Sequence, residues 1–155
     1  MMETRLGVCP SLRLVSVNPS SFGWVVRNGK NMTTTEKKKL YGLLKEILAL
    51  KYGDKCLRCK KPEWQMSHIY PRGRYKRMEH EPENILPLCS GCHIFFWHKN
   101  PIEAHEWLKL AIPKEQLQRL KLMANTYMGK FDPKFQILFL EKMLTQLQKK
   151  YVRNN

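Results

Sequence analysis

Two closely spaced pairs of cysteines constrain this chain more than any other feature of its sequence. Cys56 and Cys59 form the first pair, Cys89 and Cys92 form the second, and 29 residues separate the pairs. Each Cys-x2-Cys segment can fold into a tight turn that directs both sulfurs to one point, and four thiolates complete the tetrahedron that Zn²⁺ accepts. The pattern therefore predicts a four-cysteine zinc site. Because four thiolates leave no open coordination position, we expect this zinc to be structural.

The cysteine count also indicates the chemical environment of the protein. The chain has five cysteines, and Cys9 has no partner at a comparable spacing. An odd count with two x2 spacings argues against a secreted disulfide framework and favours a metal site in a reducing compartment. We therefore expect an intracellular, cytoplasmic protein. The alternative is that one or both pairs are merely buried thiols.

The composition fits one compact domain with a basic surface. The 155 residues include 28 lysines and arginines against 13 aspartates and glutamates, which gives a formal net charge of +15. A length of about 100–200 residues is typical of one domain, and a charge this positive favours a polyanionic partner such as nucleic acid or an anionic membrane surface. No stretch approaches the roughly 18 uninterrupted apolar residues that a membrane span requires, so we expect no integral membrane protein.

The first 31 residues differ in composition from the rest of the chain. Residues 1–31 hold only five charged residues and lack the continuous apolar run of a signal peptide. We expect a poorly ordered N-terminal tail here. A sharper interpretation is that Met32 is the true start; in either case the domain covers residues 32–155.

Three parts follow one another within this domain. Thr33 and Glu36 suit a capping box, and the leucines that follow at helical spacing predict a leading helix over residues 32–53. Residues 54–100 hold the two cysteine pairs. In this middle part we expect strands near 64–67 and 85–88, a charged loop over 71–83 and a helix from Cys89 onward.

Residues 101–155 predict a helical extension. Asn100-Pro101 and Asp132-Pro133 each place an N-cap residue before a proline, and Pro113 cannot lie inside a helix. We expect helices near 101–111, 114–127 and 133–151. We also expect large apolar side chains of this extension to close a second layer over the core: Trp107, Leu110, Phe131, Phe135 and Phe139.

The middle part carries a second set of polar residues in a specific order. His68 follows Ser67 at the end of the first expected strand, Asn84 precedes the second cysteine pair by five residues, and His93 follows that pair directly. With the two cysteine pairs, this order resembles the HNH endonuclease family, most closely its phage-type, zinc-stapled ββα-metal members. The matching stretches are CLRCKKPEWQMSHIYPRGRYKR, EPENILPLCSGCH and the following WHKNP, within about residues 54–107.

The resemblance implies a fold and an activity. The fold would be α+β, with a small ββα-metal core stapled by the zinc, one leading helix and about three trailing helices. The activity would be metal-dependent hydrolysis of DNA phosphodiester bonds. His68 would be the general base, His93 would bind a catalytic divalent ion such as Mg²⁺, Mn²⁺ or Ni²⁺, and Asn84 would hold the loop that aims His68. A phage-encoded protein acting in the host cytoplasm is compatible with this resemblance.

One position departs from the family pattern. Many members carry a metal-ligating Asp before the base histidine, whereas this chain carries Ser67, a weak and neutral ligand. The identity of the catalytic metal is therefore open. His98 is the candidate replacement ligand, although five residues of ideal α-helix place it about 140° around the axis from His93.

A basic segment lies between the candidate base and Asn84. Its members are Arg72, Arg74, Lys76 and Arg77, with Tyr70 and Tyr75 interleaved. We expect these cations to bind DNA through backbone phosphates; an ordinary solvated loop is the alternative. Of the other two histidines, we expect His80 to be exposed within this charged loop and His105 to pack within its helix.

Two other functions remain open for the sequence. A zinc-knuckle protein that binds nucleic acid without cutting it would share the cysteines and the charge. A protein in which zinc only organises a surface for a protein partner would share the cysteines alone. The zinc-knuckle alternative does not explain the placement of His68 and His93, and the protein-partner alternative predicts no salt-dependent affinity for DNA.

Overall fold

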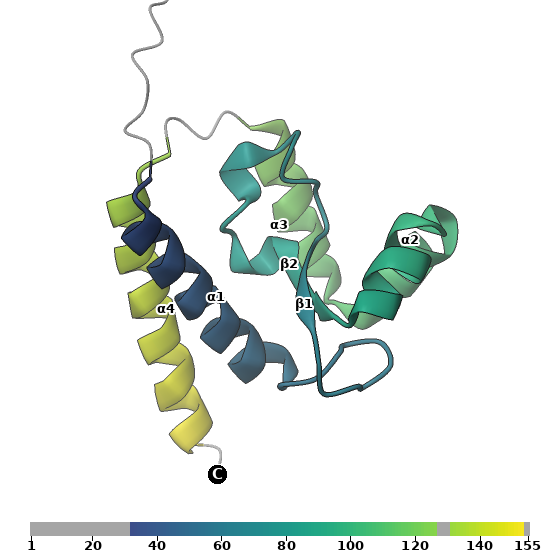
Figure 1. Cartoon of the computed structure of the whole chain (residues 1–155), viewed down its shortest axis with the longest axis horizontal. Helices are drawn as coiled ribbons and strands as arrows, with labels where there is room; N and C mark the ends of the chain where they lie inside the picture. The colour runs from purple at the N-terminus through teal and green to yellow at the C-terminus, as the bar shows by residue number, and fades with distance from the viewer. Residues whose placement is uncertain (1–31, 127–130, 154–155) are drawn as a thin grey trace, which may run out of the picture.

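The computed structural model describes residues 32–126 and 131–153, and the expected tail at 1–31 lies outside these described residues. Within them the chain is an α+β protein with a small two-stranded sheet and several helices (Figure 1). In chain order the elements are α1 (Thr34–Tyr52), β1 (Gln65–His68), the 3₁₀ turns η1 (Lys76–Met78) and η2 (Pro82–Asn84), β2 (Ile85–Leu88), the π-helix η3 (Cys92–His98), α2 (Pro101–Ala111), α3 (Lys114–Asn125) and α4 (Pro133–Arg153). No helix among the described residues is both long and apolar enough to span a bilayer.

The first and last helices form a parallel pair along one side of the molecule (Figure 1). The Thr33 side chain accepts a hydrogen bond from the Glu36 amide, and the Glu36 carboxylate accepts one from the Thr33 amide, so the expected capping box is present. Lys39 of α1 pairs with Glu141 of α4 at 2.7 Å. The buried faces of the two helices meet in one core cluster, whose fully or nearly buried members are Leu40, Leu44, Ile47, Leu48, Ile85, Ile137, Leu140 and Leu144.

The antiparallel pair of β1 and β2 lies beside α1, which β2 contacts. The strands are antiparallel, with Ser67 opposite Leu86 and His68 opposite Ile85. All four residues of β2 are buried. Ile85 packs into the cluster of α1 and α4, whereas Leu86 and Leu88 pack with the cysteines and α2. Because successive strand residues point to opposite faces, β2 connects two separate cores.

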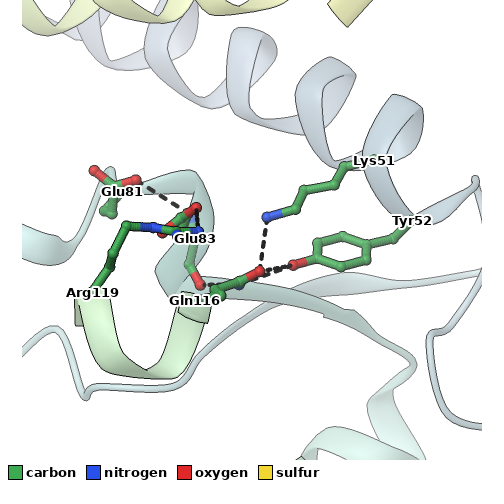
Figure 2. Close-up of polar contacts among 6 residues, drawn as sticks. All are labelled: Lys51, Tyr52, Glu81, Glu83, Gln116 and Arg119. Carbon is green, nitrogen blue, oxygen red and sulfur yellow. Dashed lines mark hydrogen bonds and ion pairs between the residues drawn. The ribbon is translucent and has the colours of Figure 1, made fainter. Parts of the chain in front are cut away.

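A polar cluster anchors α3 to the turn before β2 (Figure 2). Gln116 is 1% exposed, and its Nε2 donates to the Glu83 carbonyl at 2.7 Å while its Oε1 accepts from Lys51 Nζ at 3.0 Å. The Tyr52 hydroxyl accepts a further bond from Gln116 at 3.1 Å. Arg119 forms a two-pronged ion pair with the Glu83 carboxylate, at 2.9 and 2.6 Å. Since Glu83 precedes Asn84, this cluster fixes the turn from which Asn84 projects.

The expectation that the large apolar side chains of the helical extension close a second layer over the core is wrong in large part. Leu110 is 89% exposed, Phe135 68% and Phe139 40%, while Phe131 and Trp107 are partly buried. For Phe135 and Phe139 the reason is the orientation of α4, which turns the face of Ile137, Leu140 and Leu144 toward α1 and leaves the neighbouring stripe outside.

Three local expectations also need correction. His80 is buried, at 4% exposure, because Tyr41 and Phe131 enclose its ring. His105 is exposed on α2 rather than packed. The Asn100 side chain does not cap α2; its Nδ2 donates back to the Phe95 carbonyl at 3.2 Å.

Candidate metal centre and adjoining groove

The four cysteines of the two pairs converge on one point. The sulfurs of Cys56, Cys59, Cys89 and Cys92 all lie within 4.8 Å of one another, and among the described residues they are the group of three or more His, Cys, Asp or Glu side chains that could hold a metal ion. Three of them are buried and Cys59 is exposed. A soft tetrahedral thiolate set is the chemistry that Zn²⁺ takes in structural sites. The cysteines can therefore bind a metal such as zinc.

Backbone turns bring the sulfurs together. The Lys60 amide donates to the Cys56 carbonyl at 2.9 Å, and Lys60 adopts a left-handed φ of 64° that closes the first turn. In the second turn the Cys92 amide donates to Cys89 Sγ at 3.4 Å. Burial raises the pKa of the Cys92 thiol to about 12. Burial also opposes ionisation of Cys56, but backbone N–H groups turned toward its sulfur lower its pKa to about 6.

A groove of about 880 Å³ opens beside this centre. Its walls come from the segment after β1, from η3 and from α2, with Tyr41 of α1 at one side. The groove-lining residues include three predicted site residues, His68, His93 and His98. Within the described part of the chain, no aspartate or glutamate lines it. The candidate histidines thus gather around one cavity whose described walls hold no carboxylate.

His68 lies at the end of β1 with one ring nitrogen already engaged. Its Nε2 lies 2.9 Å from the carbonyl oxygen of Glu79, which can only accept, so Nε2 carries the proton. The other ring nitrogen, Nδ1, therefore holds the lone pair in the neutral ring. The Trp97 indole donates to the His68 carbonyl at 3.2 Å and fixes the backbone of the same residue.

Asn84 is fully buried behind the groove and does not line it. Its Oδ1 accepts from the Tyr70 amide at 2.7 Å, and its Nδ2 donates to the carbonyls of Tyr70 and Met78 at 3.1 and 2.9 Å. One side chain thus joins the two ends of the segment from Tyr70 to Met78. The Asn84 side chain therefore holds this segment in place without lining the groove.

His93 and His98 face each other on η3. Their Nε2 atoms are 3.0 Å apart and their ring centroids 4.7 Å apart. In an α-helix these positions would diverge, but i→i+5 bonding in a π-helix places them about one turn apart. Burial, followed by the charges of His98 and His68, lowers the pKa of His93 below its ordinary value. The His93 ring is therefore available in the neutral form that binds metals.

Gln65 contacts His93 from the start of β1. Its amide nitrogen lies 2.6 Å from His93 Nδ1. The oxygen and nitrogen of a glutamine amide are nearly interchangeable in position, so a 180° rotation of the Gln65 amide places its oxygen, rather than its nitrogen, against His93 Nδ1. With the oxygen on Nδ1–H, the lone pair of His93 lies on Nε2, the atom that faces His98. Metal-binding histidines are oriented in the same way in proteins.

Ser67 does not reach the groove. Its side chain is 0% exposed, and its hydroxyl has no hydrogen-bond partner among the described residues. Ser67 is also absent from the groove-lining residues, so its side chain supplies no ligand atom to the groove.

The basic segment divides between the groove and the outer surface. Arg72 and Arg74 line the groove, and Arg74 lies over the Tyr75 ring with its guanidinium carbon 5.6 Å from the centroid. Lys76 and Arg77 belong to η1 and do not line the groove. Lys76 is exposed and Arg77 partly so.

Sequence reasoning missed four residues at these sites. Gln65, Glu79 and Trp97 contact the candidate histidines. Arg58 donates to Cys92 Sγ at 3.8 Å and stacks on the Phe96 ring at 3.8 Å from the centroid. Only Arg58 had a local signal, since it is a cation between two predicted metal ligands; the others act through contacts distant in the chain.

No protein-family model matches this chain. No curated protein is significantly similar to it, and no solved structure matches it. What the site can do must therefore be judged from its own residues.

Proposed function

We propose that this protein is a metal-dependent DNA endonuclease of the HNH type, with a zinc-stapled ββα core. The supporting observation is that His68, His93 and His98 line one groove while Asn84 holds the adjoining segment from behind. Composition adds a net charge of +15, which suits a polyanionic substrate.

In this proposal His68 is the general base. Its Nε2–H donates to the Glu79 carbonyl, so Nδ1 accepts the proton of the water that attacks phosphorus. The same hydrogen bond orients the ring and stabilises the imidazolium formed after the proton transfer. Asn84 keeps the segment that carries this carbonyl in place.

His93 and His98 are the proposed ligands of the catalytic metal. Their facing Nε2 atoms fit an ion that accepts imidazole nitrogen, and Gln65 orients His93 from the other side. When bound, a divalent ion would supply positive charge beside the phosphate and its departing oxygen. A pair of neutral imidazoles suits Mn²⁺, Ni²⁺, Co²⁺ or Zn²⁺ better than Mg²⁺, which prefers oxygen ligands.

Arg72 and Arg74 are the proposed phosphate contacts at the groove. Both are exposed cations, so they would supply affinity that falls steeply with salt. Lys76 and Arg77 extend this positive surface away from the groove.

The test is cleavage of supercoiled plasmid by the zinc-loaded protein with Mg²⁺, Mn²⁺, Ni²⁺ or Co²⁺ added. His68→Ala should reduce cleavage by about 10²–10⁴-fold, the range for loss of a general base, with DNA affinity and zinc content unchanged. Arg74→Ala should instead weaken binding and flatten its salt dependence, with turnover retained at saturating DNA. Lys149→Ala, an exposed cation on α4, is the matched control for charge.

Two results would reject the proposal in favour of the other functions. Salt-dependent DNA binding without cleavage under any of the four metals would identify a zinc-knuckle nucleic-acid-binding protein. Absence of salt-dependent DNA affinity would identify zinc as the organiser of a protein-binding surface.

A further inference from the structure

Three consecutive carbonyl groups, those of Met78, Glu79 and His80, are each held by a side chain from a different element. Asn84 Nδ2 of η2 donates to the first at 2.9 Å, His68 Nε2 of β1 to the second at 2.9 Å, and Gln136 Nε2 of α4 to the third at 3.1 Å. The short segment whose Glu79 carbonyl accepts the hydrogen bond of His68 is therefore also held by Gln136, a residue of the last helix.

The side chains of this segment are held from the first helix as well. The Tyr41 hydroxyl of α1 donates to Glu79 Oε1 at 3.1 Å, and the Tyr41 ring packs edge-on against His80, with centroids 5.6 Å apart. Phe131 stacks on the His80 ring, with centroids 5.2 Å apart. The peptide groups that bind His68 thus lie between α1 and the start of α4.

We propose that Tyr41 and Gln136 are positioning residues, through which the α1–α4 pair sets the orientation of His68. The catalytic part of this inference rests on the proposed function, whereas the orientation of the His68 ring does not. The two helices supply neither the four clustered cysteines nor the histidines of the proposed metal. They nevertheless hold the groups on either side of the Glu79 carbonyl that selects the His68 tautomer, since Tyr41 binds the Glu79 carboxylate and Gln136 binds the His80 carbonyl.

The action of a general base is sensitive to small displacements of its ring. A hydrogen bond of 2.9 Å weakens steeply once its donor and acceptor separate or lose alignment, and a general base misplaced by about 1 Å can lose as much as 10²-fold in rate. Asn84 holds the Met78 carbonyl, one residue before Glu79. Beyond His68 itself, the side-chain hydrogen bonds that the described residues make to Glu79 and His80 come from Tyr41 and Gln136.

Two near-isosteric substitutions remove these restraints. Gln136→Glu keeps the size of the side chain but loses the amide donor to the His80 carbonyl. Tyr41→Phe removes only the hydroxyl that binds Glu79. Gln148→Glu and Tyr151→Phe are the matched controls, since both residues are exposed on α4.

The experiment combines nuclear magnetic resonance with cleavage kinetics on the full-length, zinc-loaded chain. In wild type, the His68 Nε2–H proton should give a protected signal in ¹⁵N-edited spectra. Both substitutions should broaden or shift it and increase its exchange with water, and they should lower kcat by roughly 2- to 10-fold, the effect of one hydrogen bond, without changing KM for DNA. The double variant should lose more than either single variant, and the controls should match wild type.

An unchanged His68 signal in both folded single variants would overturn the inference, whatever the kinetics show. If one variant fails to fold by circular dichroism and zinc content, the other decides. A wild-type protein that does not cut DNA would reject the proposed function alone, because the ring signal would still report whether Tyr41 and Gln136 position His68.

Discussion

His93 and His98 meet with 3.0 Å between their Nε2 atoms because η3 is a π-helix rather than an α-helix. π-helical segments are uncommon and cluster at functional sites. In this π-helix two histidines that are five residues apart in the sequence face each other. At the end of the segment, Asn100 Nδ2 donates a hydrogen bond to the Phe95 carbonyl. The irregular backbone is thus the structural basis of the proposed metal-binding pair.

The first prediction concerns the metal that this pair selects. Cleavage should reach half its maximal rate at a lower concentration of Mn²⁺, Co²⁺ or Ni²⁺ than of Mg²⁺, because the proposed ligands are imidazole nitrogens. His98→Ala should raise the half-saturating concentration by roughly tenfold or more, since even indirect partners of metal ligands are worth about 10–100-fold in affinity. Glu103→Ala removes an exposed carboxylate of α2 that does not line the groove, and this control should leave that concentration unchanged. Equal metal requirements for wild type and His98→Ala would contradict the pairing.

The second prediction concerns the cysteine cluster. The purified protein should contain one zinc per chain, and Cys89→Ser should lose the metal and most of the folded core, because the second core cluster is built around these cysteines. Elemental analysis and a circular-dichroism melt, with and without chelator, provide the measurement. Ser90→Ala alters the exposed neighbouring residue and should keep both the zinc and the melting temperature. A fully folded, zinc-free wild type would refute the site.

Features with local causes could be predicted from the sequence. The capping box places the start of α1, Pro101 and Pro133 open α2 and α4, and the two cysteine spacings locate the metal centre. The strands lie within one residue of the expected positions. Each of these depends on neighbours within a few residues, so the sequence carries the whole signal.

Features decided by distant contacts could not be predicted. His80 lies in a charged stretch of sequence but is enclosed by Tyr41 and Phe131, which come from opposite ends of the domain. The buried face of α4 is selected by its parallel packing on α1. The π-helical form of η3 has no reliable local signal, so the facing of His93 and His98 emerged only with the structure.

The third prediction tests which face of α4 is structural. Leu140 is 0% exposed and Leu138 is 65% exposed, two residues apart on one helix. Leu140→Ala should destabilise the protein by about 2–5 kcal/mol, because it leaves a cavity between α1 and α4. Leu138→Ala should change stability by no more than about 0.5 kcal/mol, as expected for a surface substitution. Urea unfolding of the two variants gives the comparison. Similar losses of stability in both variants would mean that the face of α4 containing Leu140 is not the buried one.

The fourth prediction concerns acid sensitivity through His80. Burial lowers the pKa of His80 below its ordinary value of 6.5, and the charges of Lys37 and His68 act in the same direction while Glu79 opposes them. The native protein therefore keeps His80 neutral at a pH where the unfolded chain takes up a proton. The stability that depends on neutral His80 is complete above about pH 6.5 and is lost as the pH falls toward the lower native pKa.

His80→Phe separates this contribution from every other titrating group. Phenylalanine fills the space between Tyr41 and Phe131 and removes His80 Nε2, a buried nitrogen without a hydrogen-bond partner among the described residues. The variant should be at least as stable as wild type at about pH 7.5, because an unsatisfied polar atom is gone. Its melting temperature should fall less than that of wild type between about pH 7.5 and about pH 5, while His105→Phe should follow the wild-type curve. Parallel curves for wild type and His80→Phe would show that His80 carries none of the acid sensitivity.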